Sequence, residues 1–182
     1  LGPHTQASLT LFHDKGQDRL FAFQQPVTSL PPPPFRLFFE NVPDFETRGI
    51  EASVSTRPLP NLSFFIGATF LDAIPEDLPY APTLQASAGV NLRFLDRFKL
   101  SVDALYMDDF EQADPRFAET SGTIGNFLLL NARLGYELPL PGDRVAAELF
   151  VAVENLTDTN YEYKRGYPMP GINGMIGATM SF

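Results

Sequence analysis

The sequence predicts an all-β fold in which about eight antiparallel strands form part of the wall of a transmembrane β-barrel. Three observations lead to this prediction. Apolar and polar residues alternate with a period of two, the connections alternate between short and long, and charges of opposite sign gather at opposite ends of the strands. The apolar runs are all far shorter than the roughly 20 residues that a transmembrane helix needs.

Taken in chain order, apolar stripes place strands along the whole sequence. The first long strand contains Ala7, Leu9 and Leu11, and the second ends with Ile50, Ala52 and Val54. Later stripes, in order, run over 62–70, 84–94, 98–106, 128–136, 145–153 and 172–182. This spacing gives about eight strands and favours helix nowhere.

The alternation is clearest between Thr83 and Leu95. One face of this segment carries Leu84, Ala86, Ala88, Val90, Leu92 and Phe94, and the other carries Gln85, Ser87, Gly89, Asn91 and Arg93. Successive side chains of a strand point to opposite faces, so the segment is a strand with one apolar and one polar face.

The connections fall into two classes of length. Residues 57–61, 95–97 and 139–143 are short turns, whereas 26–35, 73–82, 113–123 and 155–170 are longer and polar or rich in proline. Because the two classes alternate along the chain, we place them at opposite ends of the strands. Short periplasmic turns and long extracellular loops are typical of outer-membrane barrels. A soluble antiparallel sandwich remains the alternative, since its strands alternate as well.

Charged residues of opposite sign also gather at the two opposite ends of the strands. Basic residues near the short turns are Arg57, Arg93, Lys99, Arg97 and Arg144, and acidic residues near the long loops are Asp72, Glu76, Asp77, Asp108, Asp109, Glu111 and Asp114. Solvated rims are the simpler interpretation. The sharper hypothesis is that the acidic rim, with Asp108, Asp109 and Glu111 as candidate residues, binds a divalent cation or attracts a cationic ligand.

Composition excludes several classes of function. The 182 residues carry a formal net charge of -9 with no basic cluster, which argues against nucleic acid as a partner. Cysteine is absent, so the chain has neither a disulfide framework nor a thiolate metal site. His4 and His13 belong to no recognisable catalytic set, and we predict no enzymatic activity and no cofactor. The chain opens without a signal peptide, and we expect it to begin inside a longer polypeptide.

Four segments resemble one known family. They are ENLTDTNYEY at 154–163, GYPMPG at 166–171, RGIEASVSTRPLPNLSFFIGATFLDA at 48–73 and DLPYAPTLQASAGVNLRF at 77–94. Together they resemble strands and turns of TonB-dependent outer-membrane receptors, and the resemblance covers nearly the whole chain. From the residues alone, Asn155, Thr157 and Asp158 are loop formers that bond nearby backbone groups.

The resemblance implies a location and partners. It implies a gram-negative outer membrane, surrounding lipid, and a barrel of about 22 strands with an inner plug and a TonB-binding segment. Residues 1–182 would then be the C-terminal part of the barrel, with the plug and the other strands outside them. The parent protein would take up a scarce nutrient such as a ferric siderophore, haem or cobalamin. By the same resemblance, Ile176, Met180 and Phe182 form the signal that the barrel-assembly machinery reads.

A complete eight-stranded barrel is the second alternative. A barrel of that size is filled by its inward side chains. Small inward residues would fill it poorly, and these are Ser63, Gly67, Ser87, Gly89, Gly135, Gly177 and Ser181. They suit a wide wall that faces water or a plug.

Overall fold

The computed structural model describes residues 4–26, 35–76, 78–112, 122–140 and 145–182. Its elements are all strands, namely β1 (Thr5–Pro26), β2 (Phe35–Leu59), β3 (Leu62–Ile74), β4 (Leu84–Phe94), β5 (Phe98–Met107), β6 (Phe110–Gln112), β7 (Gly122–Ile124), β8 (Phe127–Glu137), β9 (Ala146–Glu154) and β10 (Asn173–Ser181). Within these ranges no helix is long and apolar enough to cross a membrane.

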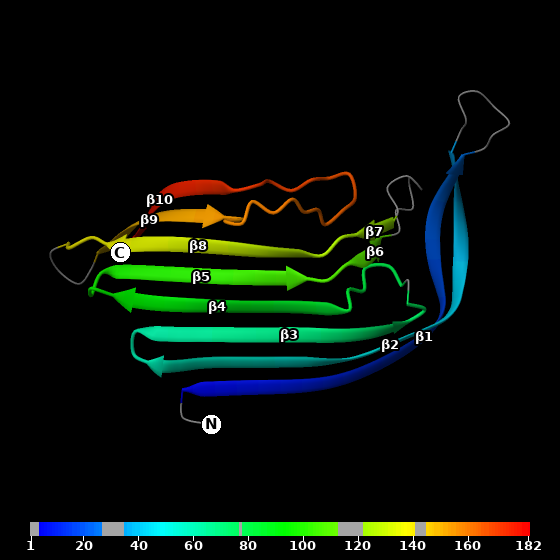
Figure 1. Cartoon of the computed structure of the whole chain (residues 1–182), viewed down its shortest axis with the longest axis horizontal. Coiled ribbons are helices and arrows are strands. Elements are labelled where there is room, and N and C mark those ends of the chain that lie inside the picture. The colour runs from blue at the N-terminus through cyan, green and yellow to red at the C-terminus, as the bar shows by residue number, and fades with distance from the viewer. Residues whose placement is uncertain (1–3, 27–34, 77, 113–121, 141–144) are drawn as a thin grey trace.

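Eight of the strands form one antiparallel sheet in the order β1-β2-β3-β4-β5-β8-β9-β10. Each of these eight strands pairs with the next one of the sheet along the chain, β5 pairing with β8 across the connection that contains β6 and β7, and Figure 1 shows them side by side in a single layer. The predicted fold of about eight antiparallel strands is confirmed. The small β6–β7 hairpin, in the connection between β5 and β8, was not predicted, because this connection reads as a polar loop.

The connections alternate between the two ends of the sheet as predicted. Those after β2, β4 and β8 lie at one end, which we call the short-turn end, and those after β1, β3, β5 and β9 lie at the other, the long-loop end (Figure 1). The lengths follow the prediction except at one position: the connection after β8, residues 138–145, has as many residues as the one after β1, residues 27–34. Of the rim charges named above, Asp77, Asp114 and Arg144 lie outside the described residues.

The hairpin of β1 and β2 is longer than the apolar stripes suggest. The pairing is continuous from Thr5 to Gln17, then passes over Asp18, which has a positive φ of 58° and accepts a 2.7 Å hydrogen bond from Asn41 Nδ2. The register is unchanged on either side of Asp18, and Pro43, the residue opposite it, has no N–H to donate to the ladder. Beyond this point the hairpin turns away from the rest of the sheet (Figure 1).

The register aligns apolar side chains in rows across the sheet. One such row is Leu59, Leu62, Leu92, Leu100, Leu134, Val151 and Ile176, each directly opposite the next. Many residues of this apolar face are uncovered, among them Leu11 at 72% exposure and Ile176 at 85%. A sandwich would bury such a face under a second sheet. The described residues form only one large sheet, so the soluble sandwich is wrong.

The opposite, polar face carries rows of small and polar residues. One row runs through Ser8, Ser53, Gly67 and Ser87. In the described part of the chain, β1 and β10 pair with β2 and β9 only and leave both sheet edges open. The closed eight-stranded barrel is therefore wrong as well.

Aromatic rings on the polar face pack over glycines of the next strand. At each of these pairs, a Cβ added to the glycine would lie within 2.5 Å of the ring. The pairs, each directly opposite in the register, are Phe12 with Gly49, Phe45 with Gly16, Phe65 with Gly89 and Phe150 with Gly177. The glycines leave room for the rings, and the rings cover backbone that glycine would otherwise expose.

Candidate functional site

A chain of alternating charges crosses the polar face near the short-turn end. Arg93 and Lys99 lie directly opposite each other, an arrangement of like charges that alone destabilises a sheet. Glu137 compensates for it, with Oε1 at 3.0 Å from Arg93 Nη2 and 2.6 Å from Lys99 Nζ. Glu148 extends the network, with Oε2 at 3.0 Å from Lys99 Nζ, and Arg133 forms an ion pair with Glu148. Four strands are thus joined by one ionic network.

Arg133 also lies over an aromatic ring. Its guanidinium carbon is 4.2 Å from the centre of the Phe150 ring, within the range of a cation–π contact. Phe150 itself covers Gly177 of β10. The ionic network and the aromatic–glycine contacts therefore support each other between β8 and β10.

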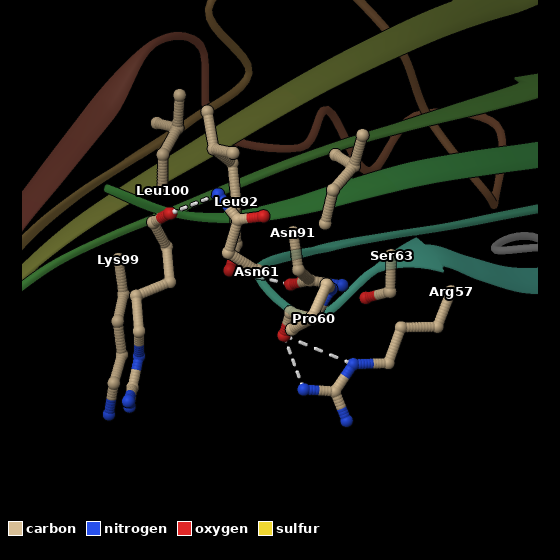
Figure 2. Close-up of a pocket in the computed structure, with 11 residues that line it drawn as sticks. Arg57, Pro60, Asn61, Ser63, Asn91, Leu92, Lys99 and Leu100 are labelled. Atoms are coloured by element: carbon tan, nitrogen blue, oxygen red, sulfur yellow. Dashed lines mark hydrogen bonds between the residues drawn. The ribbon is translucent and has the colours of Figure 1, made fainter. Parts of the chain in front are cut away.

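A hollow of about 430 Å³ adjoins this network at the short-turn end (Figure 2). Arg57 lines it and donates from its guanidinium to the carbonyl oxygen of Pro60, while Asn61 Nδ2 donates to the carbonyl oxygen of Arg93 at 3.0 Å. In Figure 2, Lys99 and Arg57 extend away from the side on which Leu92 and Leu100 lie. The polar side of this end of the wall is therefore basic.

At the long-loop end, Asn155 organises the connection between β9 and β10. It is only 3% exposed and has a positive φ of 51°. Its Nδ2 donates to the carbonyl oxygens of Thr159 at 2.9 Å and Pro170 at 3.2 Å, and its Oδ1 accepts from Thr159 N at 2.9 Å. Asp158 Oδ1 accepts from Ile172 N at 2.9 Å. The loop-forming role predicted for these residues is what their contacts show.

The same loop places two tyrosines against Phe127, the first residue of β8. Phe127, Tyr161 and Tyr163 form an aromatic cluster with ring centres 5.1 to 5.6 Å apart. Burial is the main cause that raises the pKa of Tyr163, and an electrostatic interaction with the neighbouring Tyr161 raises it further. Gln112 of β6 is 2% exposed and accepts a 2.7 Å hydrogen bond from Arg165 N, which ties the loop to the β6–β7 hairpin. A hollow of about 430 Å³ beside the cluster is lined by Asn126, Asn160, Tyr161 and Glu162, among others.

The three acidic residues singled out in the sequence, Asp108, Asp109 and Glu111, lie in β6 and the two residues before it. Asp108 Oδ1 accepts from Tyr106 at 3.3 Å and from Asp109 N at 3.1 Å, and Glu111 Oε1 accepts from the Thr123 hydroxyl at 2.5 Å across the β6–β7 hairpin. Within the described ranges, no group of three or more His, Asp or Glu side chains could hold a metal ion. Cation binding by these three residues stays a prediction.

The residues of the predicted assembly signal lie at the open edge of the sheet. Ile176 and Met180 belong to β10 and are 85% and 65% exposed, and Phe182 follows it fully exposed. All three continue the apolar face. Their recognition by assembly machinery stays a prediction.

These features define a class of protein. A single antiparallel sheet with an uncovered apolar face and a polar, charge-bearing face matches the wall of a barrel that spans an outer membrane. The family model described as TonB dependent receptor-like, β-barrel, matches residues 1–156. The chain belongs to this family, whose members lie in the outer membrane of gram-negative bacteria. We therefore call the polar face the lumen face and the long-loop end extracellular.

Solved structures of similar fold agree with this assignment. The siderophore receptor PiuA from Acinetobacter baumannii has a TM-score of 0.69 and 16% identity, over 98% of this chain and 26% of that one. The ferric-catecholate import receptor Fiu from E. coli K12 has a TM-score of 0.69 and 18% identity, over 100% and 26%. The copper transporter OprC has a TM-score of 0.71 and 15% identity, over 100% and 29%. The curated protein sequences contain no match.

The chain thus spans between a quarter and a third of the length of these structures. At identities below 20%, the likeness concerns the fold alone. It does not extend to the ligands that these proteins are named for.

Proposed function

We propose that residues 1–182 form the C-terminal part of the barrel of a TonB-dependent transporter, with an inner plug and further strands outside them. The parent protein would bind a metal chelate at its extracellular end and carry it inward with energy delivered by the TonB complex. It would be a transporter and not an enzyme. The lumen face carries this proposal, because a polar, ion-paired surface suits a passage that is filled with water or a polar domain.

A ferric siderophore is the first ligand that we propose, with haem and cobalamin as the other candidates. The support is indirect: the similar structures include receptors named for siderophores, ferric catecholates and enterobactin. Tyr163, which is 41% exposed and packs on the buried Phe127, gives the extracellular end an aromatic ring on which a planar or aromatic ligand would pack.

Uptake by cells tests the proposal. A strain that lacks the parent receptor would be supplied with radiolabelled iron bound to catecholate, hydroxamate or citrate chelators, and separately with haem and cobalamin. We expect one of these ligands to be accumulated only when the receptor and a functional TonB are both present. Equal accumulation with and without TonB would contradict the proposed transport, and accumulation of none of them would contradict the proposed ligand class.

A further inference from the structure

The apolar face gives way to charged residues at the extracellular side of β1, β2 and β3. Its last fully apolar row there is Leu11, Ile50 and Phe70, which are directly opposite one another and 45% to 72% exposed. Two residues further along each strand, on the same face, the next row is His13, Arg48 and Asp72. A row that would meet hydrocarbon is thus followed by a row in which every side chain is ionisable.

In the row after that, Lys15 and Glu46 are opposite each other and Ile74 of β3, 51% exposed, lies beside Glu46. We call the five ionisable residues of these two rows the ionic belt. Glu46 lies 2.8 Å from His13 Nε2 and 3.0 Å from Lys15 Nζ, and Asp72 lies 2.6 Å from Arg48 Nη2. The three basic side chains nevertheless remain open to their surroundings, at 52%, 66% and 59% exposure for His13, Lys15 and Arg48. The carboxylates hold the basic groups in place without covering them.

The height of the ionic belt matches the headgroup layer of a bilayer. Two residue steps at about 3.3 Å along a strand tilted by about 40° raise Arg48 about 5 Å above Ile50, and four steps raise Lys15 about 10 Å above Leu11. A bilayer of about 40 to 45 Å with a hydrocarbon core of about 30 Å has a headgroup layer of about 5 to 8 Å on each side. Arg48 therefore lies at the height of the lipid phosphates, and Lys15 begins just above that layer, from which its long side chain can reach down to it.

We propose that the ionic belt binds the phosphate of a lipid headgroup with a net negative charge in the outer leaflet. The belt continues the apolar face into the headgroup layer, so a lipid whose chains cover Leu11 and Ile50 brings its phosphate to Lys15 and Arg48. Asp72 engages two of the five N–H donors of Arg48, and Glu46 engages one of the three of Lys15. Three donors of Arg48 and two of Lys15 remain on side chains that are 59% and 66% exposed, and such charged donors suit a phosphate oxygen.

Lipid binding by the complete receptor tests this inference. The receptor, purified in detergent, would be titrated with phosphatidic acid, with phosphatidylcholine and with inorganic phosphate, and bound lipid would be counted by native mass spectrometry. At about 1 kcal/mol for each basic residue near a membrane surface, Lys15→Gln and Arg48→Gln should each weaken phosphatidic acid binding about fivefold, and together about 30-fold. Arg57→Gln, an exposed cation on the lumen face, is the matched control and should leave binding unchanged.

Four outcomes would overturn the inference. They are undiminished binding by the double variant, an equal loss in Arg57→Gln, equal binding of phosphatidylcholine, and displacement of the lipid by inorganic phosphate, which would indicate a site for free anions. If the double variant fails to fold, the salt dependence of lipid binding by the wild-type receptor still tests the inference. Its phosphatidic acid binding must fall as ionic strength rises, and binding that salt leaves unchanged would contradict an electrostatic headgroup site.

Discussion

Two neighbouring residues of β4 offer a sharp test of which face meets lipid. Ala88 lies on the apolar face, in a row with Ile66 and Ala104, and Ser87 lies on the lumen face opposite Gly67. We expect Ala88→Arg to destabilise the barrel strongly and Ser87→Arg to be tolerated. The two substitutions add the same side chain at adjacent positions, so they differ mainly in the surroundings that the new charge enters.

The structure gives the size of the effect. The apolar stripe of β4 runs from Leu84 to Phe94, ten residue steps, which at about 3.3 Å per step and a tilt of about 40° make a band about 25 Å high. Ala88 lies about 10 Å from one edge and about 15 Å from the other, close to the midplane. An arginine there costs about 2 to 4 kcal/mol, which lowers the folding equilibrium constant by about 30- to 700-fold.

The lumen position is very different. Ser87 lines a hollow of about 310 Å³ whose other residues include Thr10, Glu51 and Gln85. An arginine in it would remain hydrated and would have a carboxylate nearby. A surface substitution of this kind changes the free energy of unfolding by about 0.5 kcal/mol or less.

Folding of the complete receptor into lipid vesicles measures the difference. The folded fraction would be followed against denaturant concentration by the gel mobility shift between unheated and boiled samples. We expect a midpoint well below wild type for Ala88→Arg and close to wild type for Ser87→Arg. Equal losses in the two variants, or a larger loss for Ser87→Arg, would refute the assignment of the two faces.

Three further predictions concern the lumen face and the loop between β9 and β10. Phe65→Ala should lower the free energy of unfolding by about 1 kcal/mol in the same assay, because it uncovers the backbone of Gly89. Adding Gly89→Ala to this variant should recover part of the loss, because the ring that blocks a Cβ at position 89 is then absent. Glu137→Gln should cost about 0.5 to 1 kcal/mol, because it leaves two like charges opposed across a strand pair, and a loss that high salt does not reduce would contradict this cause. Asn155→Ala should open the loop to protease on intact cells, whereas Asn160→Ala, at an exposed position, should not; equal cleavage of both would contradict the role of the buried amide.

The sequence predicts most of the sheet because a barrel wall repeats one simple rule. Each residue of a strand faces lipid or lumen, so apolar stripes such as 84–94 record the strands directly. The Phe residues of the lumen face do not follow this rule. Phe65 and Phe150 interrupt the expected polar alternation, and only the register shows that each lies opposite a glycine. A ring and a glycine 24 to 27 positions apart carry no local signal of their pairing.

The same limit applies to the candidate sites. Glu137 and Glu148 read as ordinary polar positions, and their pairing with Lys99 depends on how three strands align. The tyrosines of the β9–β10 loop likewise reach Phe127 through the fold. Asn155, in contrast, could be named in advance, because an Asn that follows a strand within a polar loop favours the left-handed backbone and bonds to nearby groups.

Spin labels along β4 test the central claim most directly. These 182 residues contain no cysteine, so single cysteines from 84 to 94, in a receptor with any cysteine elsewhere replaced, would label this segment specifically in the vesicle-bound protein. Labels at even positions should collide with oxygen dissolved in the bilayer, and labels at odd positions with a water-soluble nickel chelate or with neither reagent. A two-residue period in oxygen accessibility is the predicted result. Oxygen accessibility that is uniform along the strand, or highest at the odd positions, would contradict a wall whose apolar face meets lipid.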